Sequence, residues 1–407
     1  MQHSLITVKI HYVGVNDRNK HRIEALWPLP YGVSYNSYLI DDDIVALVDT
    51  VDACYFGTYI NKIKSIIGDR PIQYLIINHM EPDHSGSINM IRQHYPDIVI
   101  VGNKQTFSMI EGYYGVVKEQ YTVKDGDFLA LGKHMLRFYL TPMVHWPETM
   151  MTFDETDGVL FSGDAFGCFG TLDGGFIDRR INLDKYWEEM IRYYANIVGK
   201  YGSPVQKALQ KLGGLPIKTI CSTHGPVWTE EIPRVVSIYD RLSRYEAEEG
   251  VVIAYGSMYG NTEQMAEAIA SELSAQGIKN IVMHNVSKSH PSYILKDIFK
   301  YKGLIVGSPT YSNQIFPEVE ALLGKILLRE VKNRFFTYFG SFTWAGQAIK
   351  QIALLTQGLQ WESVTTPIEM KQGDIPSVEE ECRTLGRKMA QLLMNPINQI
   401  SATFHQG

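Results

Sequence analysis

Short apolar runs separated by turn residues make up the first quarter of the chain. The runs Tyr35–Ile40 and Ile44–Val48 flank three consecutive aspartates, a pattern that predicts a β-hairpin. Apolar residues at helical spacing over Tyr59–Ile67 then predict a helix, and a short β-type run follows at Tyr74–Ile77. This part of the chain therefore mixes hairpins with helices.

The same mixture continues to about residue 249. The pattern predicts helices over Ser87–His94 and Leu183–Val198, and strands over Ile98–Val101, Met135–Leu140, Met150–Phe153, Gly158–Ser162 and Ile217–Cys221. A charged amphipathic segment, Glu231–Glu249, predicts a last helix that Gly250 ends. We place a boundary here, between one domain over residues 1–249 and a second over residues 250–407.

From Val251 onwards strands and helices alternate strictly. Strands are predicted over Val251–Tyr255, Ile281–Asn285, Gly303–Gly307 and Phe335–Gly340, with helices that begin at Thr262 and Gly346. Such alternation predicts a doubly wound parallel sheet with helices on both faces.

Composition and charge limit the class of partner. The 407 residues suffice for two or three domains, and 45% hydrophobic with 20% charged residues is typical of globular proteins. A net charge of −6 without any basic block argues against a nucleic-acid surface. We expect a small molecule or a small protein as partner.

The N-terminus and the cysteines carry further expectations. No apolar stretch resembles a secretion signal or a membrane span, so we expect a cytoplasmic protein. The four cysteines form no Cys-x-x-Cys pair, which argues against a zinc ribbon, a disulfide scaffold and an appended rubredoxin or ferredoxin module. Electrons for any redox chemistry are therefore expected from an external donor.

A glycine-rich loop, Gly256–Thr262, links the first strand of the second domain to its first helix. Hydroxyls of Ser257 and Thr262, together with backbone N–H groups, can surround a phosphate at the positive end of that helix. By itself such a loop could equally be a plain strand-to-helix turn.

Two more loops follow strands at the edge where open α/β sheets bind ligands. They are Gly307–Asn313 and Gly340–Gly346, in which Tyr311 and Trp344 offer aromatic faces to a flavin ring. The candidate cofactor-binding residues are Ser257, Met258, Tyr259, Gly260, Asn261, Thr262, Ser308, Pro309, Thr310, Tyr311, Asn313, Ser341, Phe342, Thr343, Trp344 and Gly346. In order and spacing the three loops resemble flavodoxin, which implies FMN, and the Gly-x-Gly-x-x-Gly pattern of dinucleotide sites is absent.

The first domain concentrates metal-ligand residue types in the hexapeptide His79-Met80-Glu81-Pro82-Asp83-His84. A lone histidine is usually a surface or core residue, but two carboxylates and two imidazoles this close repel one another unless a cation or solvent compensates them. Three further candidates, His145, Asp164 and His224, each follow an apolar run. The pattern predicts a metal site built from seven side chains.

These sites and their order resemble the metallo-β-lactamase superfamily over roughly residues 30–245. The resemblance implies an αββα sandwich with metals at one rim. Zinc hydrolases of the superfamily carry histidine where this chain has Glu81, so the donor set contains four nitrogens and three carboxylates. Harder, more anionic donors favour iron or manganese over zinc.

Taken as a whole, the chain resembles the flavodiiron proteins (A-type flavoproteins), which join these two domains in this order. The resemblance implies two non-haem irons, with FMN passing electrons from rubredoxin or a reduced deazaflavin cofactor. It implies reduction of dioxygen to water or nitric oxide to nitrous oxide, and a head-to-tail homodimer that could pair further into a dimer of dimers. It assigns His79, Glu81 and His145 to one iron, Asp83, His84 and His224 to the other, and Asp164 to both; His84 is not a ligand in every member.

Two alternatives belong to other functional classes. A zinc metallohydrolase fused to a flavodoxin module would act through a metal-bound hydroxide. A pure electron carrier would use the first domain only to dock a partner. Glu81 counts against the hydrolase, and the seven filled ligand positions count against the carrier.

Overall fold

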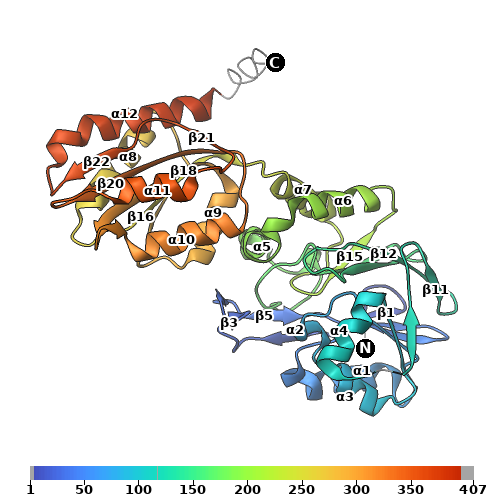
Figure 1. Cartoon of the computed structure of the whole chain (residues 1–407). Coiled ribbons are helices and arrows are strands. Elements are labelled where there is room, and N and C mark those ends of the chain that lie inside the picture. Colours follow the sequence, from blue (N-terminus) through green and yellow to red (C-terminus); the bar gives the residue numbers. More distant parts are fainter. Residues whose placement is uncertain (1–3, 117, 396–407) are drawn as a thin grey trace, which may run out of the picture. The chain divides into compact units, whose positions relative to one another are not determined.

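The computed structural model describes residues 4–116 and 118–395, and the chain divides into two compact units between Ser243 and Arg244 (Figure 1). Residue 249, where we place the end of the first domain, already lies in β16 (Glu248–Tyr255), the first strand of the second unit. None of the helices described is both long and apolar enough to cross a membrane.

The first unit contains two sheets. The first has the order β1-β6-β7-β8-β9-β10, formed by β1 (Ile10–Tyr12), β6 (Tyr38–Asp41), β7 (Val45–Val48), β8 (Tyr74–Ile76), β9 (Val99–Gly102) and β10 (Gln120–Thr122). The second runs in sequence order through β11 (Phe128–Ala130), β12 (Met135–Leu140), β13 (Met150–Asp154), β14 (Val159–Gly163) and β15 (Thr219–Ser222). The predicted hairpin is confirmed as the antiparallel pair β6–β7.

Two small ladders lie beside these sheets. One pairs β2 (Val15–Asp17) with β5 (Val33–Tyr35), and the other pairs β3 (Arg22–Ile23) with β4 (Trp27–Pro28).

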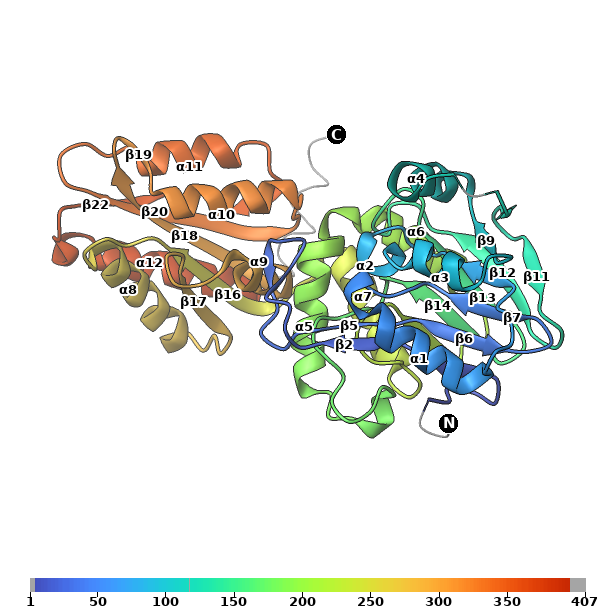
Figure 2. The ribbon, with the colours of Figure 1, turned by 90° about the horizontal axis from the view of Figure 1, so that it is seen from below.

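Helices cover the outer sides of the two sheets. In the described residues, all the helices of this unit are α1 (Phe56–Ile67), α2 (Pro82–Ser85), α3 (Ile88–His94), α4 (Lys104–Tyr114), α5 (Asp184–Tyr193), α6 (Gly202–Leu212) and α7 (Ile232–Ser243), with short helical turns η1 (Ala53–Tyr55), η2 (Asp178–Arg180), η3 (Tyr194–Val198) and η4 (Gly199–Tyr201). Helices α1 and α3 lie on the first sheet, and α6 and α7 on the second (Figures 1 and 2). The αββα sandwich expected for this unit is thereby confirmed.

The helix predicted over Glu231–Glu249 is shorter than expected, and Gly250 does not end it. Helix α7 stops at Ser243, and the backbone then turns at Tyr245, whose φ of 57° lies in the left-handed region. Gly250 lies within a strand, where a Cβ atom would come within 2.4 Å of the Tyr301 ring. This glycine therefore permits a close approach between strands, which periodicity alone does not reveal.

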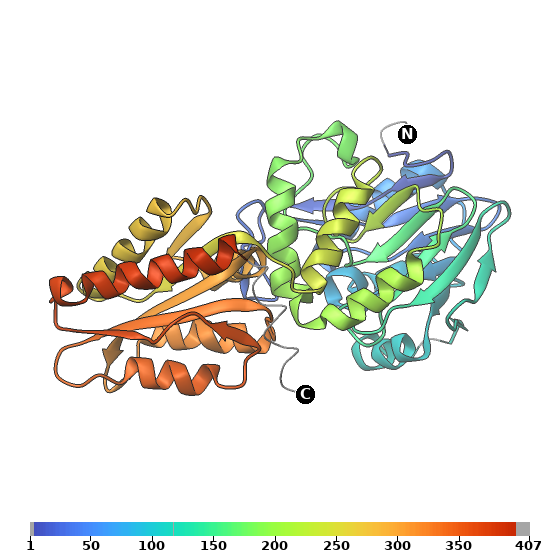
Figure 3. The same cartoon turned by 90° about the horizontal axis from the view of Figure 1, so that it is seen from above.

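The second unit is a doubly wound sheet with the strand order β17-β16-β18-β20-β21, confirming the predicted parallel fold. Its strands besides β16 are β17 (Ile281–Asn285), β18 (Tyr301–Tyr311), β19 (Gln314–Ile315), β20 (Arg334–Phe342), β21 (Trp361–Ser363) and β22 (Ile368–Lys371). Its helices are α8 (Asn261–Ala275), α9 (Pro291–Lys300), α10 (Pro317–Leu328), α11 (Ala348–Thr356) and α12 (Ile375–Met394). Helices α8 and α12 cover one face and α9, α10 and α11 the other (Figure 3).

One predicted loop is largely strand. Residues 307–311 continue β18, and the chain turns at Ser312 and Asn313, both with positive φ, before pairing back as β19. Two consecutive left-handed residues are the geometry of a tight hairpin turn. The hairpin presents Tyr311 at its tip, at the carboxyl end of β18.

Candidate functional site

The seven predicted metal ligands of the first unit come together at one rim of the sandwich. His79 to His84 lie between β8 and the end of α2, and His145 lies between β12 and β13. Asp164 follows β14 directly, and one residue, Thr223, separates His224 from the end of β15. Neighbouring strand ends thus bring together side chains that are far apart in the sequence.

One group consists of His79, Glu81, His145 and Asp164. Glu81 Oε2 lies 3.4 Å from His79 Nε2 and 3.2 Å from His145 Nε2. Asp164 Oδ2 lies 3.0 Å from His145 Nε2 and 3.4 Å from His79 Nε2. Two imidazole nitrogens and two carboxylate oxygens therefore face a common point.

Asp83, His84 and His224 form the second group. Asp83 Oδ2 lies 3.4 Å from the Nε2 atoms of both His84 and His224, which are 3.1 Å apart. The second oxygen of Asp164, Oδ1, lies 3.1 Å from His84 Nε2. Asp164 thus directs one oxygen to each group, and His84 directs its Nε2 into the second.

The chemistry of this donor set fits a pair of metal ions. Among the described residues, His79 Nε2 and both oxygens of Asp83 are buried without a hydrogen-bond partner. Leaving such groups unpaired costs about 1–3 kcal/mol each, more for charged ones, unless a cation binds them. Four imidazoles and three carboxylates, with Asp164 common to both groups, supply enough ligands for two such ions.

Without metal the electrostatics of the cluster are strongly perturbed. Burial opposes protonation of His84 and His145, yet the neighbouring carboxylates raise the pKa of each to about 9. Burial likewise opposes ionisation of Asp164, but His79 and His84 hold its pKa well below the usual range. The buried carboxylates therefore attract positive charge into the site.

Three supporting groups were not recognised in the sequence. His79 Nδ1 donates to Glu148 Oε1 at 2.8 Å, and His224 Nδ1 donates to the Ser34 carbonyl at 2.7 Å. The hydroxyl of Thr223 donates to Asp164 Oδ1 at 2.5 Å. These bonds place the proton on Nδ1, so that Nε2 of both histidines presents its lone pair to the metal position. Glu148 follows His145 by three residues, but nothing local indicates that it faces His79.

Removing the Glu148 carboxylate should weaken metal binding without touching a ligand. We expect Glu148→Ala to lower iron affinity about 10–100-fold, because His79 loses the acceptor that fixes its tautomer and orientation. Glu148→Gln is the matched control with a smaller loss, since its amide oxygen can still accept. Iron retained after dialysis against graded chelator measures both, and equal retention in Glu148→Ala and wild type contradicts the expectation.

The predicted cofactor loops of the second unit meet at the carboxyl ends of β16, β18 and β20. Thr262 Oγ1 and Ser341 Oγ lie 2.9 Å apart and join the first loop to the third. Thr310 Oγ1 accepts from the backbone N–H groups of Gln347 and Ala348, which joins the second to the third. The three loops therefore form one continuous edge.

The N-terminus of α8 fits a phosphate. Gly260 occupies the capping position with a φ of 89°, and as a glycine it offers no side chain to accept a hydrogen bond from the first turn. The N–H groups there remain available to an anion, aided by the helix dipole. Tyr259 and Trp344 are 88% and 84% exposed, so both aromatic faces are open to a ring.

Two side chains refine the cofactor prediction. The hydroxyl of Ser308 is buried and bonded to backbone groups of Pro309 and Phe316, which leaves only its main chain to offer a ligand. Glu369, unrecognised in the sequence, lies against the third loop: a Cβ on Gly346 would meet both its carboxylate oxygens at 2.4 Å. Gly346 is required for this close approach, and burial raises the pKa of Glu369.

A two-metal rim on a metallo-β-lactamase-like sandwich, joined to a flavodoxin-like sheet, defines a class of redox flavoproteins. Residues 33–225 match the model of the ODP family beta lactamases, and residues 253–386 match the flavodoxin model. A nitric oxide reductase from Moorella thermoacetica is 33% identical over 95% of this chain and 97% of its own length. An anaerobic nitric oxide reductase flavorubredoxin from Pectobacterium carotovorum is 31% identical over 97% of this chain and 79% of its own length.

Solved structures agree with these sequence matches. The rubredoxin oxygen:oxidoreductase of Desulfovibrio gigas superposes with a TM-score of 0.92 at 30% identity, covering 98% of this chain and 99% of its own. The flavodiiron protein of Giardia intestinalis gives a TM-score of 0.91 at 26% identity, covering 96% of each chain. The chain belongs to the flavodiiron protein family. It is an oxidoreductase whose cofactors are FMN and a non-haem diiron centre.

Proposed function

We propose that the protein reduces dioxygen to water, nitric oxide to nitrous oxide, or both, with FMN passing electrons to two irons. The irons are held by His79, Glu81, Asp83, His84, His145, Asp164 and His224. The observation that carries the proposal is the position of Asp164, whose two oxygens face the two ligand groups from one side chain. A carboxylate shared in this way holds two metals close together, as bimetallic catalysis requires.

When bound, ferrous irons supply two electrons and open positions for a gas, and reduced FMN supplies two more. The four electrons match the reduction of one dioxygen to two waters. Residues of the chain fix the site: Glu148 and the Ser34 carbonyl orient two imidazoles, and Thr223 orients Asp164. Trp146 and Tyr193 pack against His79 and His224 and restrict the movement of the two imidazoles.

Glu81 favours this reaction over zinc-dependent hydrolysis. Its Oε2 lies within 3.4 Å of two histidine nitrogens, so a carboxylate occupies a position where the hydrolases have imidazole. The resulting three-carboxylate set is harder and more anionic than zinc hydrolases use.

Metal analysis and gas consumption on one anaerobic preparation test the proposal. We expect about two irons and one FMN per chain, and rapid consumption of dioxygen or nitric oxide by the reduced protein. The relative rates with the two gases identify the substrate. Two zincs in place of iron, or no consumption of either gas by fully loaded protein, would overturn the proposal.

An external donor and a dimer complete the proposal. Names of the relatives associate such proteins with rubredoxin, and reduced deazaflavin cofactor is the second donor to test. We propose a head-to-tail homodimer, with a dimer of dimers as the larger assembly to test, because a flavin and a metal centre in separate units need close approach for electron transfer. Light scattering and stopped-flow reduction of FMN by each donor decide these points; a monomer with full activity contradicts the dimer.

The flavin residues proposed are the sixteen candidates of the three loops, among them Thr262, Tyr311 and Trp344. The contact between Thr262 and Ser341, the uncapped N-terminus of α8 and the exposed aromatic rings support this assignment.

A further inference from the structure

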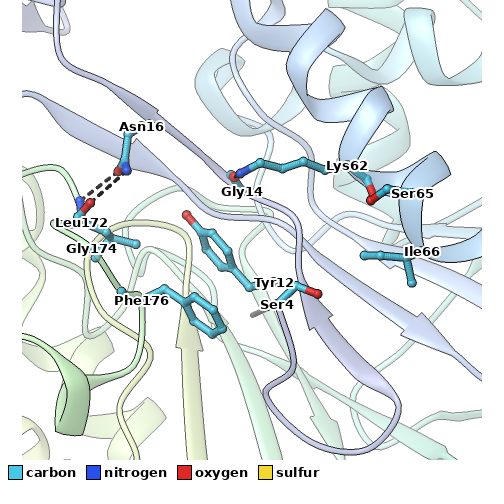
Figure 4. A pocket seen from close by; sticks show the side chains of 11 residues that line it. Ser4, Tyr12, Gly14, Asn16, Lys62, Ser65, Ile66, Leu172, Gly174 and Phe176 are labelled. Carbon is cyan, nitrogen blue, oxygen red and sulfur yellow. Dashed lines mark hydrogen bonds between the residues drawn. The ribbon is translucent and has the colours of Figure 1, made fainter. Parts of the chain in front are cut away.

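A cavity lies in the first unit, and none of its lining residues is a proposed metal ligand. Its volume is about 450 Å³, within the range of roughly 300–1,000 Å³ typical of small-molecule sites. It is bounded by β1, the turn that leads into β2, helix α1 and the segment around residues 172–176 (Figure 4). The gas reduction proposed above makes no use of it.

One cation faces this cavity. Lys62 of α1 extends along it and donates from Nζ to the Gly14 carbonyl at 2.5 Å, with the ammonium 5.7 Å from the centre of the Tyr12 ring (Figure 4). Among the described residues it forms no ion pair, and burial lowers the pKa of the ammonium. An ammonium carries three N–H donors, and the Gly14 carbonyl accepts from one of them. The partly buried charge of Lys62 therefore keeps further N–H groups that a ligand can use. An anionic ligand would neutralise the charge and accept hydrogen bonds from the unused N–H groups.

The cavity also has a flat apolar wall. Tyr12 and Phe176 are stacked, with ring centres 4.7 Å apart and planes inclined by 10°. Figure 4 shows both rings below the Lys62 chain. The two rings cover each other's inner faces, so a further planar group can pack against an outer face or the edges of the pair.

Hydrogen bonds hold the walls in place. Asn16 Nδ2 donates to the Leu172 carbonyl at 3.0 Å, and the Leu172 N–H donates to Asn16 Oδ1 at 2.8 Å (dashed lines in Figure 4). A Cβ atom on Gly14 would come within 2.5 Å of the Tyr35 carbonyl, so the turn is tightly packed against β5. A cavity whose walls are fixed before binding loses little entropy on binding a ligand.

We propose that this cavity binds a small aromatic carboxylate, with the carboxylate on Lys62 Nζ and the ring against Tyr12 and Phe176. The ammonium selects the anion, and the stacked wall selects a planar ring over an aliphatic or inorganic anion. The site is independent of the metal and flavin sites.

Calorimetric titration of the full-length, cofactor-loaded protein with benzoate tests the proposal. Wild type is expected to bind benzoate, and Lys62→Gln to weaken binding at least about tenfold, since the ion pair is lost. Lys64→Gln changes an exposed lysine on the same helix and should leave the affinity unchanged. Thermal unfolding of both variants verifies that they fold.

Phe176→Leu tests the aromatic wall separately, and it should weaken the binding of benzoate more than the binding of acetate. Three results would overturn the proposal: wild type that does not bind benzoate, equal benzoate affinity in wild type and Lys62→Gln, or inorganic phosphate that binds as tightly as benzoate. The last would indicate a general anion site without selectivity for a ring.

Discussion

Asp164→Ala is expected to remove iron from the first unit and abolish gas reduction, while FMN stays bound to the second. Asp164 is buried and directs one oxygen to each ligand group, so its loss removes a donor from both. Loss of a group that only supports a metal ligand lowers metal affinity or activity about 10–100-fold. Removal of a ligand shared by both metals should therefore lower activity by more than about 100-fold. Elemental analysis, the flavin spectrum and the gas-consumption rate measure the three effects.

A carboxylate on the same hairpin provides the control for Asp164→Ala. Glu155 pairs with Arg137 at the surface, so Glu155→Gln should leave iron content, FMN and activity unchanged. Two irons retained by folded Asp164→Ala protein would show that Asp164 does not bridge the metals. Loss of FMN along with iron would indicate general unfolding instead of a local effect.

Arg334→Met is expected to destabilise the second unit by about 3–5 kcal/mol, the largest stability change we predict. The Arg334 side chain is 1% exposed and donates to five backbone carbonyls. The acceptors are those of Ile298, Phe299, Tyr245, Lys332 and Asn333, at 2.7–3.2 Å. Methionine has a similar length but no donor, so these buried oxygens lose their partners.

The position of Arg334 gives its charge a favourable environment. Burial lowers the pKa of its guanidinium to about 9, which still leaves it charged at neutral pH. Two of its acceptors belong to the last turn of α9, where the helix dipole favours a cation.

Chemical denaturation, monitored through the release of the flavin, measures this loss of stability. Arg334→Lys should lose less stability than Arg334→Met but still some, because an ammonium cannot reproduce the planar fork of donors. Lys279→Met, at an exposed site of the same unit, is the surface control. A stability of Arg334→Met within about 1 kcal/mol of wild type would show that relief of the buried charge offsets the lost bonds.

Local patterns predicted most elements because hydrophobic periodicity reports which face of a segment is buried. The hairpin β6–β7, helix α1 and the alternating strands and helices after Val251 all follow from it. The segment 231–249 shows its limit. Its charged pattern fits one long helix, but the chain leaves α7 at Ser243 and enters a strand whose partners lie elsewhere in the sequence.

Sequence alone determined the chemistry of this protein: a hexapeptide rich in ligands, three isolated ligand residues, three loops at strand ends and a carboxylate at Glu81. These signals are local because each depends on residue types over a few positions. The tertiary structure decided which distant residues contact these side chains. Glu148 meets His79 across 69 residues, Ser34 meets His224 across 190, and Lys62 faces a stacked pair formed by Tyr12 and Phe176. Such pairings depend on how strands align in the sheets and how side chains pack, and neither is set by the neighbouring residues alone.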